Sequence, residues 1–245
     1  MTPDQFMSRL LDVASEPYRQ SGRFAWHFAR GKLGGDPAFR GMLERGLIPD
    51  GARVLDLGCG QGLLASWLLA ARRLCEGGCW PQGWPGAPGI AGLRGIELMP
   101  RDVERARNAL GNQAEFVLGN ICHTPFGTAD VVVILDVLHY VDYAAQDAVL
   151  ARVAGALAPS GTLLLRVGDA SAGLPFRISN WADHLVTFVR GHRLDRLYCR
   201  SLAEWTSALQ SLGFEVEPVP MHAGTPFANI LLVSRLGARR SPGIC

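Results

Sequence analysis

The stretch VLDLGCGQG, residues 54–62, gives the strongest single indication of the architecture. Its first four residues are apolar apart from Asp56, which is typical of a buried strand. Gly58, Gly60 and Gly62 follow. Glycine weakens regular structure, so three glycines within five residues indicate a tight turn that needs their conformational freedom. A turn between a strand and a helix brings backbone N–H groups close to a ligand at the helix N-terminus. The stretch therefore predicts a ligand-binding turn after the first strand.

Strands and helices alternate along the rest of the chain. Apolar runs predict strands at 53–57, 90–98, 114–118, 130–135, 162–167, 214–219 and 229–234. Amphipathic spacing predicts helices at 62–73, 100–110, 144–157 and 202–212. This alternation is typical of an α/β, doubly wound, mostly parallel sheet. The loop between the last two strands is too short for a parallel crossover, so we expect that pair to be antiparallel.

Two further features set the predicted domain organisation. Residues 1–49 show the apolar spacing of helices and are expected to form an N-terminal helical extension or lid before a main domain at 50–245. Within that domain, about 75–89 is rich in Gly, Pro and Trp and reads as an inserted loop. A second insertion is expected at about 170–197, with a helix at 174–193.

The spacing of the glycines bears on the ligand. A dinucleotide-binding fingerprint reads G-x-G-x-x-G, whereas this chain has G-x-G-x-G with leucine at position 63. Asp56 precedes the first glycine by two residues, and its charge would repel a pyrophosphate. An acid at that position suits a ligand that carries an ammonium or a sulfonium.

The run from Asp56 to Gly62 resembles the first motif of the class I S-adenosylmethionine-dependent methyltransferases. The resemblance implies a Rossmann-like, seven-stranded sheet in which strand seven lies between strands five and six. It also implies methyl transfer from S-adenosylmethionine to a nucleophile.

Later stretches match further motifs of that family. The resemblance assigns Glu97 to the ribose hydroxyls, Asn120, where the family usually has Asp, to the adenine amino group, and the Ile121 backbone to the adenine ring. Asp136 would contact the cofactor or shape the exit of the methyl group. The full set of implied cofactor residues is Asp56, Gly58, Cys59, Gly60, Gly62, Glu97, Leu98, Asn120, Ile121 and Asp136.

Residues after the fourth strand are candidates for work on the substrate. His139 could act as a general base or only pack over the cofactor, and Tyr140 is a neighbouring donor. Trp26 and Trp181 are candidate walls of an apolar pocket for an aromatic or lipid-like small molecule. The alternative for the helix at 174–193 is a lid that packs on the domain. The stretches at 22–33 and 36–46 also resemble methyltransferases of bacterial aryl-polyene-type pigment clusters.

Composition excludes several classes of protein. The formal net charge is +2, only one of the 24 basic residues is lysine, and the Asn-Pro-Pro-Tyr signature of nucleic-acid amino methylation is absent, so we expect no nucleic-acid partner. Six cysteines without disulfide or zinc spacing predict no metal and a reducing, cytoplasmic setting. No signal peptide or membrane-spanning run is apparent, although peripheral membrane contact fits an apolar substrate. The oligomeric state is not predicted.

Two other functions remain open at this point. A chain with this fold could bind the cofactor without transferring a methyl group and act as a partner subunit. A nicotinamide-dependent oxidoreductase is disfavoured by the glycine spacing and by the terminal strand pair.

Overall fold

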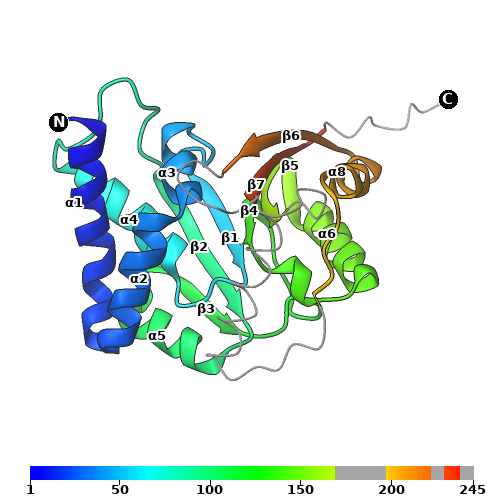
Figure 1. Ribbon diagram of the computed structural model, residues 1–245, viewed down its shortest axis with the longest axis horizontal. Coiled ribbons are helices and arrows are strands. Elements are labelled where there is room, and N and C mark those ends of the chain that lie inside the picture. Colours follow the sequence, from blue (N-terminus) through cyan, green and yellow to red (C-terminus); the bar gives the residue numbers. More distant parts are fainter. Residues whose placement is uncertain (169–196, 222–228, 238–245) are drawn as a thin grey trace. The chain divides into compact units, whose positions relative to one another are not determined.

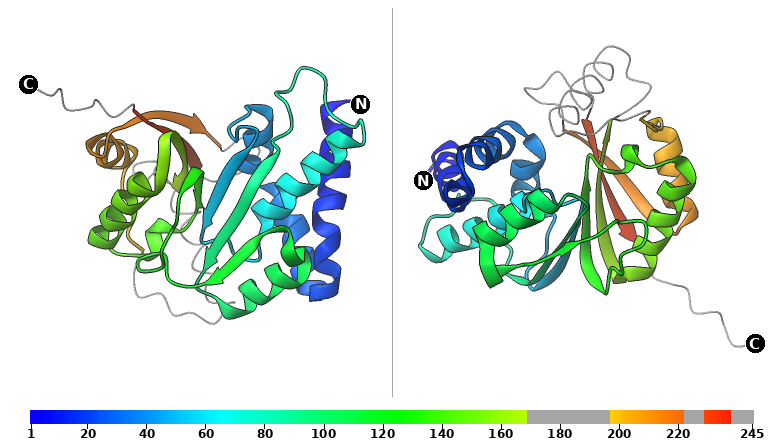
Figure 2. Two further views of the ribbon diagram at one scale, coloured as in Figure 1. Left: turned by 180° about the vertical axis from the view of Figure 1, so that it is seen from behind. Right: turned by 90° about the horizontal axis from the view of Figure 1, so that it is seen from below.

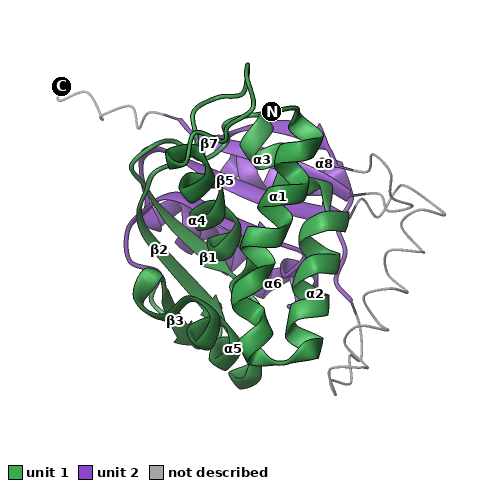
Figure 3. Cartoon of the chain, turned by 90° about the vertical axis from the view of Figure 1, so that its left-hand side faces the viewer, with its two compact units in different colours: residues 1–125 green, residues 126–245 purple. Residues whose placement is uncertain are grey.

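The computed structural model describes residues 1–168, 197–221 and 229–237. The predicted helix at 174–193, with Trp181, lies outside these ranges. The chain divides into two compact units, Met1–Pro125 and Phe126–Cys245 (Figure 3). The N-terminal helices belong to the same unit as the first three strands.

The first unit contains three parallel strands with helices packed against them (Figure 1). Its strands are β1 (Ala52–Leu57), β2 (Ile90–Glu97) and β3 (Glu115–Leu118). Its helices are α1 (Pro3–Ser15), η1 (Glu16–Ser21), α2 (Arg23–Gly35), α3 (Pro37–Glu44), α4 (Leu63–Glu76), α5 (Pro100–Leu110) and η2 (Gly111–Gln113). The expected helices of residues 1–49 are therefore present.

The N-terminal helix α1 is fixed at both its start and its side. Thr2 and Gln5 form a capping box, which satisfies the free N–H groups of the first turn. The buried Phe6 ring lies 5.0 Å from the ring of Trp80 and 5.6 Å from that of Trp84, both with edge-to-face geometry. The predicted inserted loop thus packs on α1, which lies beside α2 (Figure 3).

The second unit has parallel and antiparallel strands. Its strands are β4 (Ala129–Leu135), β5 (Leu157–Gly168), β6 (Phe214–Pro220) and β7 (Asn229–Leu236). Its helices are η3 (Leu138–Tyr140), α6 (Tyr143–Ala156) and α8 (Leu202–Ser211), of which α6 and α8 lie side by side (Figures 1 and 2). The side chain of Asp142 caps α6 through the N–H of Ala145, and a capping box of Ser201 and Glu204 starts α8.

The strand order confirms the predicted topology. The seven strands follow the order β3-β2-β1-β4-β5-β7-β6. Within the second unit β4 and β5 are parallel, whereas β7 is antiparallel to both β5 and β6. Strand seven therefore lies between strands five and six. The structure is a seven-stranded, mostly parallel α/β sheet with antiparallel C-terminal strands.

The predicted start of the fifth strand was wrong. The sequence predicts a helix that ends at 157 and a strand that starts at 162, but β5 already starts at Leu157 and includes Pro159, Ser160 and Gly161. The pairing jumps from Ala129 with Leu157 to Val131 with Thr162, so the intervening residues bulge out of the ladder. Ser160 there has a φ of 62°, a left-handed conformation that a bulge can hold. Pro159, Ser160 and Gly161 thus form a bulge inside the strand.

Among the described residues, no helix combines the length and apolar character that crossing a membrane requires.

Candidate functional site

The loop between β1 and α4 has a left-handed backbone at each of its three glycines. The φ angles are 75° at Gly58, 54° at Gly60 and 78° at Gly62, a region that glycine enters without strain. At Gly62 packing adds a second requirement, because a Cβ atom would lie 2.7 Å from Cζ of Phe116. At Gly60 a Cβ atom would meet nothing within 4 Å. The predicted tight turn is present, and its open side lies at Gly60.

Glu97, the last residue of β2, binds this loop through its side chain. Its Oε2 accepts a hydrogen bond from the Gly60 N–H, and its Oε1 accepts one from the Met99 N–H, both at 2.9 Å. The N–H of Gly58 also donates to the carbonyl of Ile96 at 2.8 Å. Each carboxylate oxygen retains capacity for another donor. The half-buried Glu97 can therefore hold the loop and accept ligand hydroxyl groups at the same time.

Asp56 is a buried acid next to this loop, with 8% of its surface exposed. Burial is the main reason that its pKa is raised to about 7, and the negative charge of Glu97 adds to the effect. In the part of the chain that the structure describes, neither a hydrogen bond nor a cation offsets this shift. A positive charge that arrived beside Asp56 would favour the ionised carboxylate. The geometry thus suits a cationic ligand group.

Two other predicted residues flank these acids. Cys59 is buried, and its Sγ packs so closely on Gly95 that a Cβ atom there would come within 2.6 Å. Burial, followed by the charges of Asp56 and Glu97, raises the pKa of the Cys59 thiol, which therefore stays protonated and is not a nucleophile. Leu98 follows Glu97 directly and is 58% exposed. Its apolar side chain is therefore exposed at the surface next to Glu97.

Asn120 lies in an exposed turn after β3. Its Oδ1 accepts a hydrogen bond from the Cys122 N–H at 2.8 Å, and its backbone carbonyl accepts one from the Thr124 N–H at 2.8 Å. The amide oxygen has a second lone pair that remains available to a ligand. Ile121 is buried under the turn. The side chain of Asn120 thus shapes this turn and still presents polar atoms to the surface.

The second unit also has an acid at the carboxyl end of a strand. Asp136 follows β4 with a φ of 58°, an uncommon conformation for a residue other than glycine. Arg166 on β5 holds both of its carboxylate oxygens, through Nε at 2.8 Å and through Nη2. Arg166 is only 2% exposed, and a buried guanidinium requires such a partner. Sequence reasoning missed Arg166, although it is the one charged residue of the run 162–167.

His139 and Tyr140 lie together in the η3 turn that follows. Their ring centroids are 4.1 Å apart, and both side chains are half-buried. The N–H of Tyr198 donates to the backbone carbonyl of His139 at 2.9 Å. The structure thus ties the turn that carries the predicted catalytic residue His139 and the predicted substrate residue Tyr140 to the segment that precedes α8.

Trp26 lies on α2, a helix that contacts the glycine-rich loop. Nε2 of the buried Gln61 donates to the carbonyl of Ala25 at 2.9 Å, which links the loop to α2. The Cζ atoms of Arg19 and Arg30 lie 4.4 and 5.4 Å from the centroid of the Trp26 ring. Two guanidinium groups therefore lie over the ring of this predicted substrate residue.

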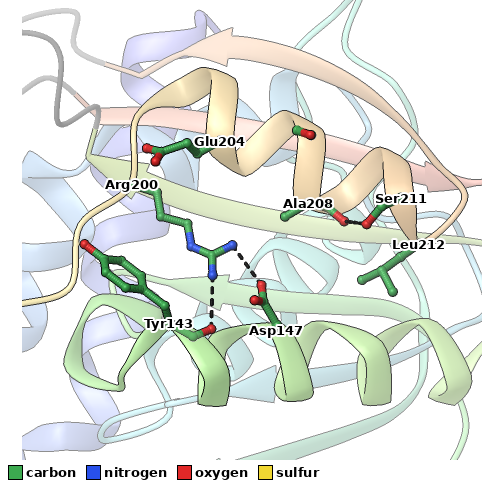
Figure 4. A pocket seen from close by; sticks show the side chains of 8 residues that line it. Tyr143, Asp147, Arg200, Glu204, Ala208, Ser211 and Leu212 are labelled. Atoms are coloured by element: carbon green, nitrogen blue, oxygen red, sulfur yellow. Dashed lines mark hydrogen bonds and ion pairs between the residues drawn. The ribbon is translucent and has the colours of Figure 1, made fainter.

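A cavity of about 550 Å³ lies between α6 and α8 (Figure 4). Arg200 crosses it, with an ion pair to Asp147 at 2.8 Å and a hydrogen bond to the Tyr143 carbonyl at 3.0 Å. None of the predicted site residues lines this cavity. No group of three or more His, Cys, Asp or Glu side chains within the described ranges could hold a metal ion.

Comparison with known proteins agrees with the motif. A family model described as "Methyltransferase domain" matches residues 25–219. The carboxy-S-adenosyl-L-methionine synthase of Chromohalobacter salexigens is 33% identical over 130 residues, which cover 51% of this chain and 43% of that protein. The match thus spans less than half of the curated relative.

Solved methyltransferase structures share the fold. The mitomycin 7-O-methyltransferase MmcR has a TM-score of 0.59 and 22% identity, over 97% of this chain and 61% of that one. The magnesium protoporphyrin IX methyltransferase of Synechocystis PCC 6803, solved with bound SAH, has a TM-score of 0.56 and 20% identity, over 87% of each chain. A Haloferax volcanii methyltransferase in complex with the activator Trm112 gives a TM-score of 0.56 and 20% identity, over 83% of this chain and 95% of that one.

Proposed function

Since the chain belongs to the class I S-adenosylmethionine-dependent methyltransferases, we propose that it transfers the methyl group of this cofactor to a small, apolar or aromatic metabolite. The observation that carries the proposal is the buried Asp56 carboxyl, which has no cation partner among the described residues and lies beside an open glycine turn. The methionyl part of the cofactor bears an ammonium group, the chemistry that Asp56 requires. The Asp56 carboxyl therefore fits the ammonium group of the cofactor that this family uses.

The remaining residues of the first unit suit the other parts of that cofactor. Glu97 keeps free lone pairs for the two ribose hydroxyls, and charge-assisted hydrogen bonds of this kind are strong. The exposed Leu98 offers an apolar surface for the adenine ring. Asn120 and the backbone of Ile121 supply polar atoms for the edge of the ring. At Gly60, where a Cβ atom would meet nothing within 4 Å, the backbone can approach the ligand closely.

When bound, the cofactor supplies an electrophilic methyl group, and the chain's task is to orient the acceptor and remove its proton. The carboxylate of Asp136 is held by Arg166 and is a poor base for that reason. His139 is the better candidate, because an imidazole accepts protons near neutral pH. Tyr140, whose ring lies against that of His139, would orient a hydroxyl group of the acceptor.

The substrate class rests on two tryptophans: Trp26, which lies on α2, and Trp181, which lies outside the described residues. Trp26, with the guanidinium groups of Arg19 and Arg30 over its ring, would bring apolar surface and positive charge to an aromatic acceptor. Trp181 is proposed as a second wall of the acceptor pocket. Several enzymes that share the fold are named as small-molecule O-methyltransferases, MmcR among them.

The first experiment measures cofactor binding. Isothermal titration of the full chain with S-adenosylhomocysteine should give a Kd of about 1 μM, which corresponds to about −8 kcal/mol. NAD serves as the matched control and should not bind. Tight NAD binding without binding of S-adenosylhomocysteine would contradict the proposal.

The second experiment identifies the acceptor. Incubation with methyl-labelled S-adenosylmethionine and a panel of phenols, catechols and hydroxylated polyenes should label an acceptor, and His139→Gln should remove that labelling. Mass spectrometry of acceptor and cofactor tests a rival function, since the curated relative is named for making a carboxylated form of the same cofactor. A carboxylated cofactor with no methylated acceptor would favour that rival. Binding without either product would favour a cofactor-binding partner subunit.

A further inference from the structure

Gln146 lies at the first turns of α6 and is fully buried, with 0% of its surface exposed. Its side-chain Nε2 is within hydrogen-bond distance of three backbone carbonyls: those of Leu138 at 3.0 Å, Val141 at 3.1 Å and Tyr198 at 2.8 Å. An amide NH2 has two hydrogens, so these three acceptors share them. Two of the acceptors bracket His139 and Tyr140 in the chain.

The third acceptor joins a different segment to the same turn. Tyr198 accepts from Gln146 through its carbonyl and donates from its N–H to the carbonyl of His139 at 2.9 Å. The hydroxyl of Tyr143 donates to the Cys199 carbonyl at 3.3 Å, and Arg200 binds the Tyr143 carbonyl and Asp147 (Figure 4). The segment around Tyr198 is therefore fixed to α6, and through Gln146 it fixes the turn.

The other side-chain atom of Gln146 shows why an amide occupies the position. Its Oε1 is buried and finds no hydrogen-bond partner among the described residues. A buried acceptor without a partner is unfavourable, and an apolar side chain would avoid that cost. The position therefore depends on the NH2 group, which joins three backbone carbonyls of two separate segments.

We propose that Gln146 is a positioning residue for the methyl-transfer reaction, because its NH2 group fixes the backbone at 138–141 and thereby places His139 and Tyr140 against the acceptor. The inference rests on the proposed function, in which His139 takes the proton of the acceptor. Gln146 itself touches neither substrate nor cofactor in this role. It acts through the turn.

The test compares Gln146→Met with Leu150→Ala in the full chain. Methionine has a similar length without donors, whereas Leu150→Ala removes a buried side chain of the same helix and leaves the three hydrogen bonds in place. NMR of histidine-labelled protein, with His139 assigned through His139→Gln, reports the environment of the ring. The rate of modification by diethyl pyrocarbonate reports its accessibility. Gln146→Glu, which also lacks the NH2 group, provides a second variant if one of the two does not fold.

Gln146→Met should shift the His139 ring signals and change the modification rate several-fold, while Leu150→Ala should lower Tm and leave both unchanged. With the acceptor identified above, kcat/KM of Gln146→Met should fall on the order of 10- to 100-fold, because small misplacements of catalytic groups are costly. The Kd for S-adenosylhomocysteine should stay unchanged.

A lowered Tm with unaltered His139 signals would show that Gln146 is only structural and would overturn the proposal. Full turnover in Gln146→Met alongside lost turnover in His139→Gln would overturn it as well. Full turnover in His139→Gln would instead show that His139 is not the base of the proposed reaction. In that case the NMR signals of the His139 ring in Gln146→Met still show whether Gln146 positions the turn.

Discussion

Asp56 and Asp136 both lie at the carboxyl ends of parallel strands, one in each compact unit, yet their surroundings differ. Asp136 has a bidentate partner in the buried Arg166. Asp56 has no cation partner in the part of the chain that the structure describes, and burial together with Glu97 raises its pKa to about 7. A carboxylate that is paired with a cation of the chain contributes to the stability of the fold. A buried carboxylate without such a partner can instead pair with a positively charged group of a ligand. From this difference we expect Asp136 to contribute mainly to the stability of the fold and Asp56 to contribute mainly to cofactor binding.

Removing the partner of Asp136 should have the largest effect. Arg166→Met leaves that carboxylate without its cation in a partly buried place, so the free energy of unfolding should fall by about 3–5 kcal/mol. Urea denaturation followed by circular dichroism measures the loss. The control is Arg235→Met, because Arg235 is exposed and its pair with Glu217 should contribute less than about 1 kcal/mol. Equal losses in the two variants would refute a structural role for the Asp136 pair.

Glu97 tests the ligand side of the comparison. Glu97→Ala removes the acceptor for the Gly60 N–H and for the ribose hydroxyls, so binding of S-adenosylhomocysteine should weaken by about 1.5–3 kcal/mol. Isothermal titration measures the change. Glu115→Ala removes an exposed acid on β3 and should leave affinity unaltered. Wild-type affinity in Glu97→Ala would remove Glu97 from the site.

The raised pKa of Asp56 makes cofactor binding dependent on pH. An ammonium group favours the ionised carboxylate, so affinity should rise as pH increases through about 7 and level off above it. At one pH unit below the pKa, S-adenosylhomocysteine should bind about tenfold more weakly than at pH 8. Titrations in buffers of different ionisation enthalpy should detect the released proton.

Asp56→Asn is the matched control, and it should bind with the same affinity across this pH range. The stability of the ligand-free protein should depend on pH in the opposite direction to the affinity, because a buried acid with a raised pKa destabilises the fold least when it is protonated. Wild-type stability should therefore fall, relative to Asp56→Asn, as pH increases from 3.8 to about 7. A wild-type Kd that does not depend on pH would contradict a role for Asp56 in binding the cation.

The smallest effect is expected at Asn120. Asn120→Asp keeps an acceptor for the Cys122 N–H and for the adenine amino group, so affinity should stay equal or improve by less than about 1 kcal/mol. Asn120→Leu removes the acceptor and should weaken binding by about 1 kcal/mol. Competition against labelled S-adenosylhomocysteine resolves such differences. Equal affinity of wild type and Asn120→Leu would exclude the side chain from the site.

Some elements could be read from sequence because their cause is local. Left-handed φ angles at Gly58, Gly60 and Gly62 require glycine, so the turn is visible in the letters themselves. Helix α5 was predicted with its observed bounds, since Pro100 at its first turn and Gly111 just after it are local signals. The start of β5 was missed because Pro159 usually interrupts a strand, and only its bulged pairing with β4 accommodates it.

The sequence by itself determined the order of strands and helices, the glycine turn and the acids that follow the strands, because each depends on neighbouring residues. Tertiary structure decided which of those acids is neutralised. Arg166 reaches Asp136 only through the register of β4 and β5, which brings together residues 30 positions apart. The pKa of Asp56 likewise depends on burial and on Glu97, 41 positions away. Solvation and charge act through space, and no spacing along the chain reports them.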